Sequence, residues 1–260
     1  MTEAPMVAHE HAVQFYDADE RGLIANVVSH LTEAYNNGSS LCVLATQAHR
    51  EAIGAGLEAS GVDTQRAIDD GRYMCVDAEA TLRKFMVHGY PDAVLFDATC
   101  GEQTRALVAR SQGRGLCGYG EMVDLLWRDE KTAAAVRLEQ LWEELRAKVG
   151  RFALLCSYRI DIFGREFHSG AIDSVLRTHS SVIPWGNDDR LQQSVSIAMA
   201  HVLGVDRTAQ ILPEITSGTP RNWAAVPRGE TMILQLRNAL PERAGDVLAL
   251  ARDYYEYEVG

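Results

Sequence analysis

Lysine is scarce in this 260-residue sequence, and the phosphate-binding loop of nucleotide hydrolases is missing. The only lysines are Lys84, Lys131 and Lys148, and none of them follows a glycine, so no G-x-x-x-x-G-K-[ST] motif exists. The turn after the first expected strand, residues 16–22, carries one glycine and three carboxylates, which would repel a triphosphate. Hydrolysis of a nucleoside triphosphate in the usual manner is therefore excluded.

Paired cysteines, excess positive charge and long apolar runs are absent as well. The five cysteines lie far apart without a CxxC pair, which indicates a reducing cytosol rather than a disulfide framework. The net charge of −11 argues against direct binding to nucleic acid. No apolar run approaches the ~18 residues of a membrane span, and the N-terminal residues do not resemble a secretion signal. We therefore expect a cytoplasmic protein that contacts neither membrane nor nucleic acid.

Short apolar runs alternate with helical patterns through the first two-thirds of the chain. This alternation predicts an α/β fold with a mostly parallel sheet and helices on both faces. Residues 92–112 are ambiguous, because their periodicity fits either a strand or the start of a helix. The expected strands are 11–16, 41–46, 73–78, 116–120 and 152–158, and the expected helices are 19–35, 48–60, 79–88 and 121–148 with a break near Asp129.

The pattern changes after Pro184, where the alternation stops. We expect residues 1–184 to form the α/β domain and residues 185–260 a small helical appendage, which either caps that domain or mediates homo-oligomerisation. Asp188 and Asp189 are good N-caps for its first helix, and Gly204 a good end. The expected appendage consists of helices at 190–203, 230–239 and 242–257, with a Pro- and Gly-rich loop at 213–229.

Several motifs occur in a characteristic order between residues 9 and 184. They are HEHAVQFY, LCVLATQAHREAI, GRYMCVDAEATLRKFM, GYGEMVDLLW, AAAVRLEQLWEELRAK, FALLCSY and HSSVIP. Together they resemble the MEDS domain, the methanogen/methylotroph DcmR-type sensory domain, a relative of KaiC/RecA-like domains. The resemblance implies a sensory protein without a phosphate loop, which senses a small organic molecule such as a hydrocarbon derivative. It also implies a signalling partner, either a histidine kinase or a transcription regulator.

Candidate ligand-binding residues follow from the expected sheet, since ligands of open parallel sheets bind at the carboxyl ends of the strands. A turn with three carboxylates favours an uncharged or cationic ligand there. Two of the candidates also have purely structural explanations. Glu121 would be a carboxylate favoured by the helix dipole in the first turn of its helix, and His49 would be a polar residue in the first turn of its own helix. The candidates are His11, Tyr16, Asp17, Thr46, Gln47, His49, Asp77, Tyr119, Glu121, Cys156 and Tyr158.

Metal binding and catalysis have weaker support in the sequence. His9 and His11 point the same way in a strand, but a metal needs a third or fourth ligand, which His179 would supply only by coincidence of the fold. We therefore expect no metal and no other cofactor. The G-x-G-x-x-G match at 113–118 leads into a strand instead of opening a helix, which argues against a dinucleotide site. Cys156 is typical of an inert core cysteine.

A non-catalytic sensory protein is thus the leading hypothesis. Two alternatives remain open: an enzyme of unfamiliar chemistry that uses Cys156 or Glu121 with a histidine, and a purely structural assembly module.

Overall fold

The computed structural model describes residues 10–217 and 224–257. The chain forms two compact units. The first unit comprises Met1–Val13 and Asp19–Tyr158, and the second comprises Gln14–Ala18 and Arg159–Gly260. His9, which the sequence suggested as one possible metal ligand, lies outside the described residues.

A six-stranded sheet with the strand order β3-β2-β6-β7-β1-β8 is the main architectural feature, and the neighbours β3-β2-β6-β7 pair in parallel. The predicted α/β fold is therefore confirmed. Each strand from β1 to β7 in this sheet lies within two residues of its expected position. The strands are β1 (His11–Tyr16), β2 (Ser40–Ala45), β3 (Tyr73–Asp77), β6 (Leu116–Gly120), β7 (Phe152–Arg159) and β8 (Ser181–Ile183).

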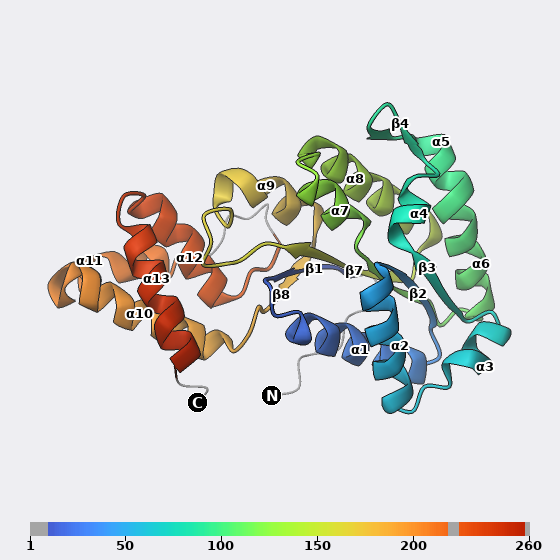
Figure 1. Ribbon diagram of the computed structural model, residues 1–260, viewed down its shortest axis with the longest axis horizontal. Helices are drawn as coiled ribbons and strands as arrows, with labels where there is room; N and C mark the ends of the chain where they lie inside the picture. The colour runs from blue at the N-terminus through green and yellow to red at the C-terminus, as the bar shows by residue number, and fades with distance from the viewer. Residues whose placement is uncertain (1–9, 218–223, 258–260) are drawn as a thin grey trace. The chain divides into compact units, whose positions relative to one another are not determined.

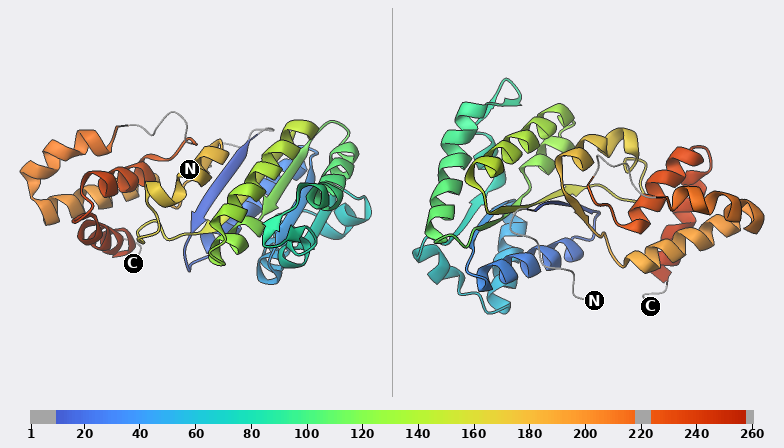
Figure 2. Two further views of the ribbon diagram at one scale, coloured as in Figure 1. Left: turned by 90° about the horizontal axis from the view of Figure 1, so that it is seen from above. Right: turned by 180° about the vertical axis from the view of Figure 1, so that it is seen from behind.

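Helices cover both faces of the sheet in the first unit (Figures 1 and 2). The crossovers from β1 to β2 and from β2 to β3 run in one direction, and those from β3 to β6 and from β6 to β7 run in the other. Because parallel crossovers are right-handed, the two sets of helices lie on opposite faces. One face carries α1 (Arg21–Asn36) and α2 (Gln47–Ala59), and the other carries α6 (Glu102–Arg110), α7 (Met122–Arg128) and α8 (Thr132–Val149).

The helix expected at 79–88 is wrong in its second half. The chain forms only the short helix α4 (Ala78–Leu82) and then the hairpin strands β4 (Met86–Val87) and β5 (Tyr90–Pro91). His88 and Gly89 adopt positive φ angles of 51° and 86°, which reverse the chain direction. The helical spacing of apolar residues in this segment does not reveal that turn.

The ambiguous segment 92–112 is helical. The Asp92 side chain accepts hydrogen bonds from the backbone N–H groups of Val94 and Leu95, and so caps the first turn. The helix runs through α5 (Ala93–Phe96) and the π-helical turn η1 (Asp97–Gly101) into α6.

Helices dominate the second unit. Asn187, not Asp188 or Asp189, caps α10, because its side chain accepts the hydrogen bond from the backbone of Arg190. The prediction of a loop at 213–229 is wrong at its start, because α11 includes Pro213. Residues 218–223 of that predicted loop lie outside the described residues. The helices are α9 (Ser169–Thr178), α10 (Asp188–Leu203), α11 (Val205–Ile215), α12 (Arg228–Ala239) and α13 (Ala244–Tyr257), and α10 packs against α11, α12 and α13.

None of the helices within residues 10–217 and 224–257 has the length and apolar character needed to cross a membrane.

Candidate functional site

Glu121 is the centre of a buried polar network at the carboxyl edge of the sheet. It directly follows β6, and only 2% of its surface is exposed. Its backbone N–H donates to the carbonyl of Leu44 at 2.9 Å, and its Oε2 accepts the backbone N–H of Thr46 at 2.8 Å. These two bonds fasten Glu121 to the end of β2.

His49 pairs with this carboxylate from the first turn of α2. Its Nδ1 donates to Oε1 of Glu121, and its Nε2 lies 3.1 Å from Oε2 of Glu20. The hydrogen bond to Glu121, with a further contribution from Glu20, raises the pKa of His49 to about 9. The ring is therefore an imidazolium at neutral pH, and this cation balances the buried carboxylate.

Tyr119 and Ser157 complete the network. The Tyr119 hydroxyl donates to Oε1 of Glu121 at 2.8 Å and lies 3.0 Å from the Ser157 hydroxyl. Sequence reasoning missed both Ser157 and the pairing of Glu20 with His49, since neither follows from local spacing. We call Thr46, His49, Tyr119, Glu121 and Ser157 the carboxyl-edge network.

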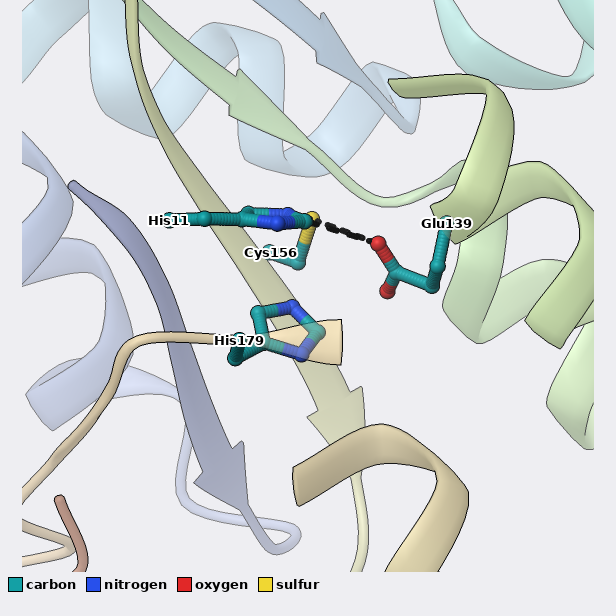
Figure 3. Close-up of side chains that lie close together, drawn as sticks. All are labelled: His11, Glu139, Cys156 and His179. Atoms are coloured by element: carbon teal, nitrogen blue, oxygen red, sulfur yellow. Dashed lines mark hydrogen bonds and ion pairs between the residues drawn. The ribbon is translucent and has the colours of Figure 1, made fainter. Parts of the chain in front are cut away.

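A second buried cluster lies on the opposite side of β7. Successive strand residues point to opposite faces, so Cys156 and Tyr158 point away from the Ser157 side and toward α8. There they meet His11 of β1 and Glu139 of α8, and we call these four residues the sheet-face cluster. Figure 3 shows His11, Cys156 and Glu139 converging from β1, β7 and α8.

Close contacts join the sheet-face cluster. The Cys156 sulfur lies 3.5 Å from His11 Nε2 and 3.6 Å from Glu139 Oε2. His11 Nε2 lies 3.4 Å from the same carboxylate oxygen, and the Tyr158 hydroxyl donates to Glu139 Oε1 at 2.7 Å. Glu139 was not among the candidates, although a carboxylate on the apolar face of a helix was a usable signal.

Burial decides the protonation of Cys156. Burial first, and the charge of Glu139 second, raise the pKa of its thiol well above the ordinary value. Burial alone would lower the pKa of His11, but hydrogen bonds to Glu139 and Glu143 outweigh it, and the net shift is upward. The raised pKa favours the thiol of Cys156 over its thiolate.

The other candidates lie outside both clusters. Gln47 is exposed and donates to Glu51 at 2.9 Å. Asp77 caps α4 through the backbone N–H of Ala80 at 2.7 Å and pairs with Arg50 at 3.1 Å.

Three further residues of interest belong to the second unit. Tyr16 is buried there, and Asp17 follows it in the same segment. His179, considered above as a metal ligand, donates from Nδ1 to the Val175 carbonyl at 2.7 Å within that unit.

A pocket of about 550 Å³ lies between α4, the β4–β5 hairpin and α7, and we call it the α4–α7 pocket. Its floor is apolar, and its rim is charged. None of the sequence candidates lines it, but α7 begins directly after Glu121 and contributes one of its walls. The lining residues are Glu79, Leu82, Arg83, Met86, Gly89, Leu125, Leu126, Arg128, Asp129 and Lys131.

Comparison with known proteins identifies the family. No curated protein matches the chain. The family model "MEthanogen/methylotroph, DcmR Sensory domain" matches residues 10–180, which is more than half of the 260 residues. This match confirms the resemblance drawn from the motifs. The chain belongs to the MEDS family of sensory domains.

Proposed function

We propose that the first unit is a non-catalytic sensory module that binds a small uncharged organic molecule in the α4–α7 pocket. The observation that carries the proposal is the position of this pocket, one helix away from the buried His49–Glu121 pair. Binding is relayed through α7 to a signalling partner, which is a histidine kinase or a transcription regulator. The five free cysteines support a role in the reducing cytoplasm.

The lining of the pocket favours an uncharged ligand. Leu82, Met86, Leu125 and Leu126 supply apolar surface, and the volume lies in the range of ligand sites, which is about 300–1,000 Å³. The charges on the rim are paired among themselves or with neighbours, so they offer no unbalanced charge to an ionic ligand. The pairs are Arg83 with Glu79 at 3.5 Å, Lys131 with Asp129 at 3.0 Å and Arg128 with Asp124 at 3.1 Å.

Helix α7 connects the pocket with the interior. Arg128 lines the pocket, and its partner Asp124 is only 1% exposed. Glu121, immediately before α7, is hydrogen-bonded to the end of β2 and to α2. A ligand that binds the pocket more tightly when α7 is in one of two positions shifts the population toward that position. Because Glu121 directly precedes α7, the shift extends to its hydrogen bonds with β2 and α2.

A binding screen on the full chain tests the proposal. The probes are short alcohols, aldehydes and halogenated hydrocarbons, and the readouts are thermal denaturation and the intrinsic tryptophan fluorescence, to which Trp127 on α7 contributes. A ligand at one hundred times its dissociation constant stabilises the native state by about 2.7 kcal/mol. We expect at least one probe to do so.

Matched variants locate the site. Leu125→Gln makes the pocket floor polar and should abolish the shift, whereas Ile68→Gln, an exposed apolar residue on another helix, should leave it intact. The proposal fails if no probe stabilises the protein, or if Leu125→Gln responds like the wild type.

A further inference from the structure

Three buried side chains place one nitrogen, one oxygen and one sulfur at the corners of a small triangle. The sides measure 3.4 Å from His11 Nε2 to Glu139 Oε2, 3.5 Å from His11 Nε2 to Cys156 Sγ, and 3.6 Å from Cys156 Sγ to Glu139 Oε2. The nitrogen-to-oxygen side exceeds the ~2.7–3.2 Å of a good hydrogen bond, whereas the two longer sides are ordinary hydrogen-bond distances to sulfur. Zinc bonds of about 2.0 Å to nitrogen and oxygen and about 2.3 Å to sulfur, at tetrahedral angles, separate ligand atoms by about 3.3–3.5 Å.

We infer that His11, Glu139 and Cys156 form a binding site for a divalent transition metal of the zinc type. This site goes beyond the proposed function, which requires no metal. The three residues come from β1, α8 and β7, and each is at most 2% exposed. Their ligand atoms form one face of a tetrahedron around the ion, and tetrahedral zinc takes one further ligand beyond these three.

A second layer of side chains orients the ligands. The Tyr158 hydroxyl donates to Glu139 Oε1 at 2.7 Å, so the other carboxylate oxygen, Oε2, faces His11 and Cys156. On the far side of the His11 ring, Nδ1 lies 3.4 Å from Oε2 of Glu143, which in turn pairs with Arg146. A carboxylate behind the second nitrogen of a metal-bound histidine fixes the ring and its tautomer.

The charges balance when the ion is bound. A thiolate and a carboxylate together neutralise a divalent cation, and the imidazole binds as the neutral ring after any proton on Nε2 has left to solvent, so no net charge is buried. Coordination replaces the proton of the Cys156 thiol by the metal, and the proton leaves to solvent. Sulfur and nitrogen ligands select zinc or a similar transition metal over magnesium or calcium.

Cobalt substitution tests the site on the untagged full chain. After removal of bound metal with a chelator, Co²⁺ should bind with one equivalent per chain and produce a thiolate-to-cobalt charge-transfer band in the near ultraviolet. Cys156→Ser should lose the band, whereas Cys75→Ser, which changes a half-buried cysteine of β3, should keep it. A band that persists in Cys156→Ser, or no stoichiometric cobalt in the wild type, overturns the inference.

X-ray absorption at the zinc edge provides a test without variants, in case Cys156→Ser does not fold. We expect one sulfur ligand at about 2.3 Å and nitrogen or oxygen ligands at about 2.0–2.1 Å. A shell without sulfur, or with several sulfurs, contradicts the assignment. Repeating the probe screen on metal-free and zinc-loaded protein separates the two proposals, because pocket binding does not depend on the metal.

Discussion

The charge of His49 links the carboxyl-edge network to pH. Glu121 and Glu20 raise its pKa from 6.5 to about 9, so folding stabilises the protonated ring. The stabilisation is fully present below the pKa of the unfolded chain and is lost as the pH rises through the pKa of the folded protein.

Replacement of His49 by Gln should destabilise the protein near neutral pH by about 3 kcal/mol, because it leaves Glu121 buried without its cation. The difference in the free energy of unfolding between wild type and variant should then shrink as the pH rises above about 9, where the wild-type ring loses its proton. Urea denaturation at a series of pH values measures this. His30→Gln, which removes only a ring bonded to the Asn26 carbonyl, is the control, and a pH-independent His49→Gln difference contradicts the prediction.

Thiol reactivity distinguishes the sensory hypothesis from an enzyme that uses Cys156. Since Cys156 is 1% exposed and its thiol pKa is raised, an aromatic disulfide reagent at neutral pH should modify it only after unfolding. The half-buried Cys75 should react first, and Cys75→Ser should remove this early reaction. Rapid labelling of Cys156 in the native protein, located by peptide mass spectrometry, would instead support the enzyme.

At the scale of elements, the close approach of α1 and α2 positions His49. Gly56 on α2 faces Val28 on α1, and a Cβ added at Gly56 would lie 2.5 Å from Val28 Cγ2. Valine is stiff at χ1 in a helix, so it yields little to such a contact.

Two glycines on α2 therefore predict opposite effects of the same substitution. Gly54→Ala, where nothing lies within 4 Å of the added Cβ, should stabilise the protein by about 0.5–1 kcal/mol through helix propensity. Gly56→Ala should destabilise it by about 1–3 kcal/mol through overpacking. Urea midpoints of the two variants give the comparison, and Val28→Ala should relieve the Gly56→Ala defect. Equal stabilisation by both alanines rules out the tight contact.

At the scale of the whole molecule, the second unit depends on segments from both sides of residue 184. The backbone N–H groups of Ala224 and Ala225 donate to the carbonyls of Leu176 and Ser180 at 2.7 and 3.0 Å. Glu230, fully buried, accepts the backbone N–H of Trp185 at 2.7 Å. The C-terminal helices therefore complete the hydrogen bonding of the segment before them.

A chain truncated after Pro184 should consequently unfold at lower urea concentration than the full chain and bind more of a hydrophobic dye, because α9 and β8 lose these partners. Light scattering on the same two proteins tests whether the C-terminal helices mediate oligomerisation. Full retention of stability in the truncated chain would contradict the dependence inferred here.

Much of the fold was predictable from local patterns. Largely apolar runs indicated β1, β2, β3, β6 and β7, since strands buried on both faces carry mostly apolar side chains. Local patterns failed where the conformation of one or two residues determines the course of the chain. The positive φ angles of His88 and Gly89 create a hairpin in a segment whose apolar residues have helical spacing. Pro213 lies within α11, although the sequence predicted a loop from this residue onward.

The sequence by itself determined the main strands of the sheet, the family and part of the two buried clusters, because periodicity and motif order are properties of neighbouring residues. Only the tertiary structure decided which of them meet. Cys156 contacts His11 across 145 positions of chain, and Glu121 contacts His49 across 72. Strand order and helix packing set such distances. The alternation of β7 then separates Ser157 from Cys156 and places them in two different buried clusters.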